Sequence, residues 1–136
     1  MQFYLAVKGI VRNAAGEILV VKRSDQDDHL PGVWETVGGG VDHEETPQQA
    51  LEREIMEEAG IKVRISEPFN VFTFRKDTGE FKVGITFLCD TDDTVVTLSE
   101  EHSEYRWIRP STFKDLESIP SLYQEIALYA KKYAGK

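Results

Sequence analysis

The 136-residue sequence has few of the features that mark secreted or membrane-spanning proteins. Cys89 is its only cysteine, which excludes an internal disulfide and favours a reducing compartment. The longest aliphatic run, Ile18–Val21, is far too short to cross a bilayer, and residues 1–8 lack the basic start and apolar stretch of a signal peptide. We therefore expect a cytoplasmic protein that does not bind a membrane.

Basic residues are also scarce. Lys and Arg number 16 against 24 Asp and Glu, which gives a net charge of −8. This balance argues against a general nucleic-acid binder, whose affinity comes from neutralised phosphates, so no nucleic-acid polymer is expected as a partner. The excess charge is local, because the segment from Asp42 to Ile61 holds seven acids and only one base, Arg53. That concentration requires an explanation.

No linker, repeat or low-complexity run interrupts the sequence, so we predict one domain over residues 1–136. Hydrophobic patterning predicts a C-terminal helix over 120–133, a Gly-rich segment over 34–41, and strands over 3–12, 17–23, 61–76, 80–90 and 105–108, with turns at 13–16 and 77–79. Several strands carry apolar residues too continuously for one buried face, which predicts burial on both faces. The pattern therefore indicates a mixed sheet covered by helices.

The most clearly marked element is a helix over residues 47–59. Thr46 and Gln49 form a capping-box pattern around Pro47, and Gly60 occupies the position of a C-terminal cap. At 100° per residue, three carboxylates of this helix, Glu54, Glu57 and Glu58, share one face. Their repulsion suits a divalent cation such as Mg²⁺ or Mn²⁺, which takes oxygen ligands. From the charge run alone, a solvated acidic face is an equal alternative.

The spacing around this helix is more specific than the charge. Gly39 is followed after five residues by Glu45, and after seven more by the run Arg53-Glu54-Ile55-Met56-Glu57-Glu58-Ala59-Gly60-Ile61. With this pattern filled at every fixed position, the sequence resembles the Nudix hydrolase family, with its Nudix box at residues 39–61. The resemblance implies an α/β fold, an α/β/α sandwich with a mixed β-sheet. It also implies an enzyme that hydrolyses a phosphoric anhydride bond with Mg²⁺ or Mn²⁺ as cofactor.

The resemblance also assigns roles to residues of the box. Glu57 and Glu58 are implied as the principal metal ligands and Glu54 as a ligand or the general base, so that Glu54 and Glu57 act in catalysis. Arg53 is implied to orient the carboxylates, and the carbonyl of Gly38 is expected as an uncharged metal ligand. Glu45 is expected to have a structural role near the helix start.

Residues outside the box add further candidates. Glu101 best matches the extra metal ligand of MutT-type members, Glu104 is second, and a solvated acidic loop is the alternative for both. Arg23 resembles a phosphate-contacting base of the family and equally fits a surface arginine. Phe72 and Phe74 offer stacking surfaces for a base, although core packing is favoured for both, as it is for Trp34.

The substrate is less clearly indicated than the reaction. Tyr123 and Thr36 stand where MutT-type hydrolases of oxidised guanine nucleotides carry an Asn and an aromatic residue, which argues against that activity. We favour hydrolysis of a nucleoside triphosphate to a monophosphate and pyrophosphate. The alternatives are an ADP-ribose or nucleotide-sugar pyrophosphatase, and a nucleotide sensor without activity. Relatives commonly form dimers, so a homodimer remains open.

Overall fold

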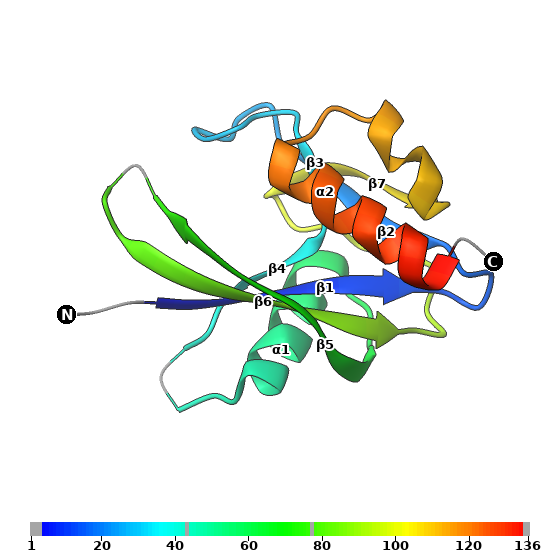
Figure 1. The fold of residues 1–136 in the computed structure, drawn as a ribbon, viewed down its shortest axis with the longest axis horizontal. Coiled ribbons are helices and arrows are strands. Elements are labelled where there is room, and N and C mark those ends of the chain that lie inside the picture. Colours follow the sequence, from blue (N-terminus) through cyan, green and yellow to red (C-terminus); the bar gives the residue numbers. More distant parts are fainter. Residues whose placement is uncertain (1–3, 43, 77, 135–136) are drawn as a thin grey trace.

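The computed structural model describes residues 4–42, 44–76 and 78–134. Seven strands, two α-helices and two short helices follow one another in the described part of the chain (Figure 1). In chain order they are β1 (Tyr4–Arg12), β2 (Ile18–Arg23), β3 (Trp34–Glu35), β4 (Val37–Gly40), α1 (Pro47–Ala59), β5 (Arg64–Arg75), β6 (Phe81–Asp90), β7 (His102–Ile108), the 3₁₀ helix η1 (Pro110–Asp115), α2 (Pro120–Tyr129) and the π-helix η2 (Ala130–Ala134).

The strands form one mixed sheet that divides beside β1. Strand β1 pairs in parallel with β6 along its whole length, from Tyr4 opposite Lys82 to Arg12 opposite Asp90. Its other side pairs with β4 along residues 6–9 and with β2 at Arg12. Strands β3 and β7 flank β2, and β5 flanks β6. Strand β4, which carries glycines of the candidate site, thus lies on the side of β1 opposite β6.

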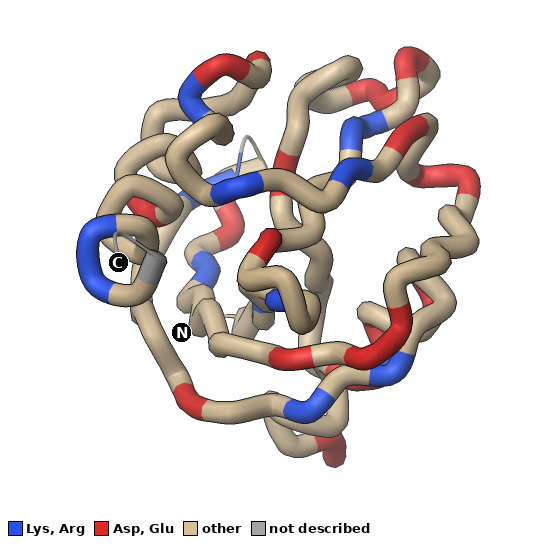
Figure 2. Tube along the Cα trace, turned by 90° about the vertical axis from the view of Figure 1, so that its right-hand side faces the viewer, with Lys and Arg blue, Asp and Glu red and all other residues tan. Residues whose placement is uncertain are grey.

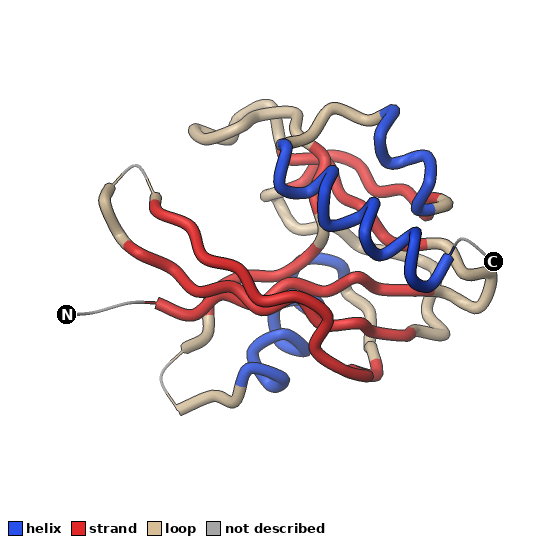
Figure 3. The backbone as a smooth tube through the Cα atoms, viewed as in Figure 1, coloured by secondary structure: helices blue, strands red, loops and turns tan. Residues whose placement is uncertain are grey.

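Helices cover both faces of this sheet (Figure 3). Side chains of α1 and one strand face form a first core, and side chains of η1, α2 and the opposite strand face form a second. Strand β1 shows the alternation, because Val7 and Val11 belong to the first core and Ile10 belongs to the second. The predicted α/β/α sandwich with a mixed sheet is confirmed, and burial on both faces explains the continuous apolar runs.

Helix α1 has the predicted ends. Thr46 accepts a hydrogen bond from the backbone of Gln49, whose side chain accepts one from the backbone of Thr46. Gly60 has a φ of 67°, the left-handed conformation of a C-terminal cap. The apolar residues Leu51, Ile55 and Ala59, which recur at helical spacing, are fully buried. These contacts fix which face of α1 remains outside the core.

Other elements differ from their predicted limits. Strand β7 begins three residues earlier than predicted, because residues 102–104 pair with the end of β2 across a bulge. The predicted C-terminal helix changes from α to π geometry after Tyr129. The start of the first predicted strand at residue 3, and Asp77 in the predicted turn, lie outside the described residues.

Two global properties bear on function. No helix in the described ranges is long and apolar enough to cross a membrane. Acidic and basic positions are interspersed around the trace (Figure 2). The acidic excess of the segment from Asp42 to Ile61 therefore has to be understood from its local contacts.

Candidate functional site

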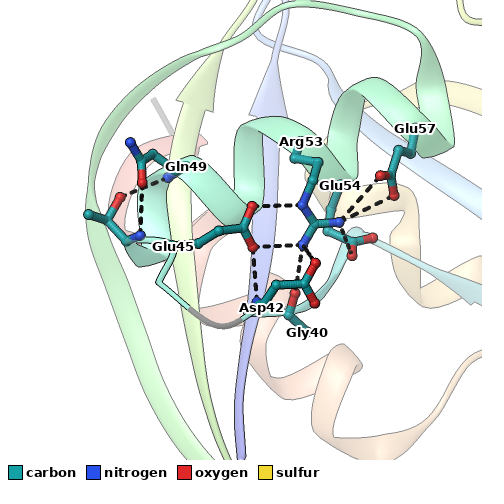
Figure 4. Close-up of polar contacts among 8 residues, drawn as sticks. Gly40, Asp42, Glu45, Gln49, Arg53, Glu54 and Glu57 are labelled. Carbon is teal, nitrogen blue, oxygen red and sulfur yellow. Dashed lines mark hydrogen bonds and ion pairs between the residues drawn. The ribbon is translucent and has the colours of Figure 1, made fainter.

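Arg53 is the centre of an ion-pair network on the acidic face of α1 (Figure 4). Its Nε and Nη2 donate to the two carboxylate oxygens of Glu45 at 2.7 and 2.9 Å, which is a bidentate pair. Its Nη1 donates to Glu54 at 3.0 Å and to Glu57 at 3.3 Å, and its Nη2 donates to the carbonyl oxygen of Gly40 at 3.2 Å. One guanidinium thus joins the end of β4, the loop before α1 and two helix carboxylates.

Glycines of β4 allow this strand to lie against the carboxylates. Gly38 has a φ of 151°, and a Cβ there would collide with the carbonyl oxygen of Val7. A Cβ on Gly39 would lie 2.5 Å from the carboxyl group of Glu54. The backbone N–H of Gly38 donates to Glu58 at 3.0 Å. Because no side chain intervenes, backbone and carboxylates share one surface.

Burial makes two of the carboxylates difficult to ionise. Burial raises the pKa of Glu58 to about 7, although the N–H of Gly38 and the charge of Lys8 oppose the rise. Burial also raises the pKa of Glu54, against the opposing effect of Arg53, and the charge of Glu101 adds to the rise in both residues. Additional positive charge would therefore favour their ionised forms.

Of the two candidates for an additional ligand, Glu101 acts electrostatically on this cluster. Its charge acts on Glu54 and Glu58, as their raised pKa values show. Glu104 instead pairs with Lys22 of β2 at 3.5 Å. Glu104 lies opposite Lys22 in the pairing of β7 with β2, whereas Glu101 precedes β7 and its carbonyl oxygen accepts a hydrogen bond from the N–H of Ser24. The ranking of Glu101 before Glu104 as an additional metal ligand stays a prediction.

Glu35 is a functional candidate that sequence reasoning missed, and three basic side chains contact it. Glu35 forms ion pairs with Lys8 at 3.7 Å and with the Nε of Arg23 at 3.3 Å, and it shares a 2.8 Å hydrogen bond with His102. Burial alone would raise the pKa of Glu35, but the charges of Lys8 and Arg23 and the hydrogen bond with His102 lower it to about 2. Arg23 also pairs with Asp27 at 3.0 Å, so two acids engage this proposed phosphate ligand.

Lys8 is a second functional candidate that sequence reasoning missed. It lies opposite Gly38 in the pairing of β1 with β4, and its charge lowers the pKa of Glu58. The available signal was a single Lys inside an otherwise apolar strand, between Val7 and Gly9. The pairing of β4 with β1 places Lys8 beside both Glu35 and the carboxylate cluster, and the sequence alone does not indicate this pairing.

A cavity of about 520 Å³ opens next to Lys8 on the α2 side of the sheet. Glu35 and Lys8 line it, and so do Phe72 and Phe74 of β5, with apolar and polar side chains of α2 opposite. The favoured interpretation of these two phenylalanines as core residues is wrong, since neither belongs to a core cluster and Phe74 is 38% exposed. Their stacked rings, with centroids 5.9 Å apart, form a wall of the cavity.

Three further sequence assignments are resolved by their contacts. Trp34 packs in the second core, as predicted, with the guanidinium of Arg106 over its ring. The hydroxyl group of Tyr123 bonds to the backbone of Leu116 and Ser118, which closes the segment before α2. Thr36 is buried. Trp34 and Tyr123 are thus engaged in packing and backbone contacts.

In the ranges that the structure describes, no group of three or more His, Cys, Asp or Glu side chains is arranged to hold a metal ion. The carboxylates of α1 are instead directed toward Arg53 and Gly38. Their chemistry nevertheless suits a hard divalent cation, because Glu54 and Glu58 offer carboxylate oxygens as ligands. Burial disfavours the ionised forms of both carboxylates, and a cation would compensate for this effect. Glu57, which is 58% exposed at its side chain, lies beside them.

The fold and the site together define an α/β/α domain whose acidic helix, Gly-rich strand and joining arginine form one polar surface. The family model described as NUDIX domain matches residues 3–127. The chain therefore belongs to the NUDIX domain family, and the predicted resemblance is confirmed.

Relatives of known sequence agree with this assignment. The chain is 32% identical over 106 residues to a MutT-like protein of Streptomyces ambofaciens, covering 78% of this chain and 64% of that protein. It is 31% identical over 106 residues to the nucleoside triphosphatase NudI of Escherichia coli, covering 70% of this chain and 74% of that one. The chain thus spans less than two thirds of the Streptomyces relative.

Solved structures support the fold over nearly the whole chain. The MutT protein of Methanosarcina mazei has a TM-score of 0.83 at 26% identity, with 98% of this chain and 96% of that chain covered. The ORF135 protein of Escherichia coli has a TM-score of 0.76 at 28% identity with the same coverage.

Proposed function

We propose that this protein is a Nudix hydrolase that cleaves the diphosphate linkage of a nucleotide, with Mg²⁺ or Mn²⁺ as cofactor. Membership of the family supports hydrolysis of a pyrophosphate bond. The observation that carries the proposal is the placement of the buried carboxylates of Glu54 and Glu58 against the glycines of β4, where burial raises the pKa of both. A helix with a merely solvated acidic face would leave these carboxylates exposed to water.

The residues of the site have distinct tasks in this proposal. Glu54, Glu57, Glu58 and Glu101, with the carbonyl of Gly38, would hold the divalent cation, which neutralises the diphosphate and activates water when bound. Arg53 keeps the carboxylates in position through its contacts with Glu45, Glu54 and Glu57. The alternative role of Glu54 is that of the general base, in which case Glu57, Glu58 and Glu101 would hold the cation without it.

The substrate that we favour is a nucleoside triphosphate, cleaved to a monophosphate and pyrophosphate. Lys8 lines the cavity and acts on Glu58, so a nucleoside in the cavity would direct its phosphates past Lys8 toward the carboxylates. The name of the NudI relative, a nucleoside triphosphatase, supports this class. Arg23 would contact a phosphate only after exchanging one of its acidic partners.

A nucleotide panel tests this function. Purified protein with Mg²⁺ should convert nucleoside triphosphates to monophosphate and pyrophosphate, identified by mass spectrometry, and a chelator should abolish turnover. Products from ADP-ribose or nucleotide sugars, with triphosphates untouched, would instead support the alternative substrate class. Binding without turnover across the panel would indicate a nucleotide sensor and contradict the proposed activity.

Two glutamates of the same segment provide a matched test of the extra ligand. Glu101→Gln should reduce Mg²⁺-dependent turnover by about 100-fold, because the proposal makes Glu101 one of the carboxylates that hold the cation in place. Glu104→Gln should retain turnover, because Glu104 pairs with Lys22 on the surface. Wild-type activity in Glu101→Gln, with the fold intact by circular dichroism, would remove Glu101 from the site.

We further propose one catalytic domain over residues 1–136 acting on a small molecule in the cytoplasm, as the buried single cysteine Cys89 suits a reducing compartment. Size-exclusion chromatography with light scattering would show whether a homodimer forms.

A further inference from the structure

The cavity beside Lys8 contains a buried carboxylate that the proposed reaction does not use. Glu125 of α2 is only 7% exposed and lines this cavity together with Asn70 of β5. Burying a carboxylate among apolar side chains is unfavourable unless hydrogen bonds compensate it. The partners of Glu125 therefore indicate what it is built to do.

One oxygen of Glu125 is fully engaged by the sheet. Its Oε2 accepts a hydrogen bond from the Nδ2 of Asn70 at 2.8 Å and another from the hydroxyl group of Thr86 at 2.9 Å. The two donors belong to the neighbouring strands β5 and β6, so the sheet fixes the orientation of this helix side chain. Both lone pairs of Oε2 are occupied in this way.

The second oxygen of Glu125 has no partner. In the described ranges, the buried side-chain atoms that lack a hydrogen bond are Arg23 Nε, Thr36 Oγ1 and His102 Nδ1. Oε1 of Glu125 accepts no hydrogen bond from the protein, and yet it is not one of these fully buried atoms. It is therefore accessible from the cavity that Glu125 lines. A rigidly held acceptor thus faces a space that the nucleoside would occupy.

The walls of the cavity suit a flat ring. Phe72 and Phe74 present aromatic faces, and Phe72 lies against the sheet where Gly84 has no side chain, because a Cβ there would collide with the ring. Leu122 and Leu128 of α2 line the same cavity. An aromatic base would bury its faces against these groups and leave its polar edge to be read by Glu125.

We propose, building on the proposed function, that Glu125 selects nucleotides whose base presents adjacent N–H donors, as the ring N–H and exocyclic amino group of guanine do. A single carboxylate oxygen accepts from both of these donors. Uracil and thymine flank their one ring N–H with two carbonyl oxygens, which the carboxylate repels. Adenine and cytosine offer an amino group beside a ring acceptor and are intermediate.

The test compares hydrolysis of GTP, ITP, ATP, CTP and UTP with Mg²⁺, in the wild type and in Glu125→Gln. In the wild type, kcat/KM for GTP should exceed that for UTP by roughly tenfold or more, mainly through KM, because an unpaired buried acceptor penalises the wrong base. ITP keeps the ring N–H but lacks the amino group, so it should fall between GTP and UTP.

Glu125→Gln keeps the shape of the side chain but replaces one acceptor by a donor. The ratio of kcat/KM for GTP to that for UTP should fall by about tenfold. Because each ratio is measured on one preparation, a lower folded fraction does not alter it. Glu117→Gln removes the same charge from an exposed position before α2 and should leave the ratio unchanged.

The outcomes separate this inference from the proposed function. Equal kcat/KM for all five nucleotides in the wild type, or a loss in Glu125→Gln that is the same for every base, would overturn the inference and leave the hydrolase intact. If no triphosphate is hydrolysed, the same comparison with GDP-glucose and UDP-glucose, which share their sugar, tests the base preference on the other substrate class. Absence of turnover on both sets would contradict the proposed function itself.

Discussion

At the scale of single residues, the site depends on how charge is distributed between Arg53 and the carboxylates around it. Arg53 lowers the pKa of Glu45 to about 2 through their bidentate hydrogen bonds, together with the backbone N–H of Asp42. Glu58 is in the opposite situation, because it is buried and its nearest donor is the neutral N–H of Gly38. These differences lead to two predictions.

Arg53→Lys should reduce kcat/KM by roughly 100-fold, because an ammonium group cannot hold Glu45 bidentately while orienting Glu54 and Glu57, and small misplacements of catalytic groups are costly. Steady-state kinetics with Mg²⁺ checks this. Arg64→Lys is the matched control, since Arg64 pairs with Asp92 and both side chains are largely exposed. A similar loss in both variants would show that Arg53 has no special positioning role.

The pH dependence of stability should reveal the burial of Glu58. Its folded-state pKa of about 7 lies above the ordinary 4.5, so the folded protein binds more protons than the unfolded chain between these values. The contribution of Glu58 to the unfolding free energy should therefore fall as pH rises from about 4.5 to about 7, by roughly 3 kcal/mol. Urea unfolding in the presence of a chelator measures it.

The control for this measurement is Glu58→Gln, which has no carboxyl group to ionise and should show a smaller decline over the same pH range. An identical decline in both proteins would mean that other groups cause it.

At the scale of secondary-structure elements, β4 and α1 have to approach closely for the site to form. The capping box and the left-handed Gly60 fix where α1 begins and ends, while Leu51, Ile55 and Ala59 fix its orientation. Strand β4 then approaches the carboxylates of Glu54 and Glu58 through glycines. The spacing of the sequence motif is thus the spacing needed to place a strand edge against one helix face.

Gly39→Ala tests whether the close approach of β4 to Glu54 is needed for activity rather than for the stability of the fold. Its methyl group would meet the carboxyl group of Glu54 at 2.5 Å, which a flexible side chain can avoid by moving. The fold should therefore persist by circular dichroism while kcat falls by about 100-fold. Gly40→Ala is the control, because a Cβ there has no neighbour within 4 Å. Equal activities of the two variants would contradict this account of β4.

At the scale of the whole molecule, most of the net charge of −8 belongs to the segment around α1. Divalent cations bound there would offset it and allow a polyanionic substrate to approach. The remaining chain is nearly balanced, and its charges are interspersed around the fold (Figure 2). Cation binding should consequently raise the unfolding free energy of the entire domain.

Mg²⁺ at 100 times its Kd should raise the unfolding free energy by about 2.7 kcal/mol, since only the folded protein assembles the carboxylates. Thermal or urea unfolding with and without Mg²⁺ measures this rise. The double variant Glu54→Gln and Glu57→Gln should lose most of it, whereas the charge-matched variant Glu67→Gln and Glu117→Gln should keep it. Stability that is indifferent to Mg²⁺ and to chelators would contradict the cation site.

The sequence by itself determined the elements whose causes are local. The capping residues and the periodic apolar stripe fix α1, and the spacing from Gly39 to Ile61 identifies the family, because hydrogen bonds and contacts between near neighbours define both. The continuous apolar strands likewise predicted a sheet buried on two faces. These features depend on residues that are close in sequence, so they can be read without a structure.

Only the tertiary structure decided what distant strands bring together. Lys8, Glu35 and His102 meet because β4 pairs with β1 and a bulge shifts β7 on β2. The ion pair of Glu104 with Lys22 likewise depends on how β7 pairs with β2. Asn70, Thr86 and Glu125 come from three elements, and no local pattern marks them. The sequence therefore indicated the reaction, whereas strand pairing and helix docking decided the shape and polarity of the cavity.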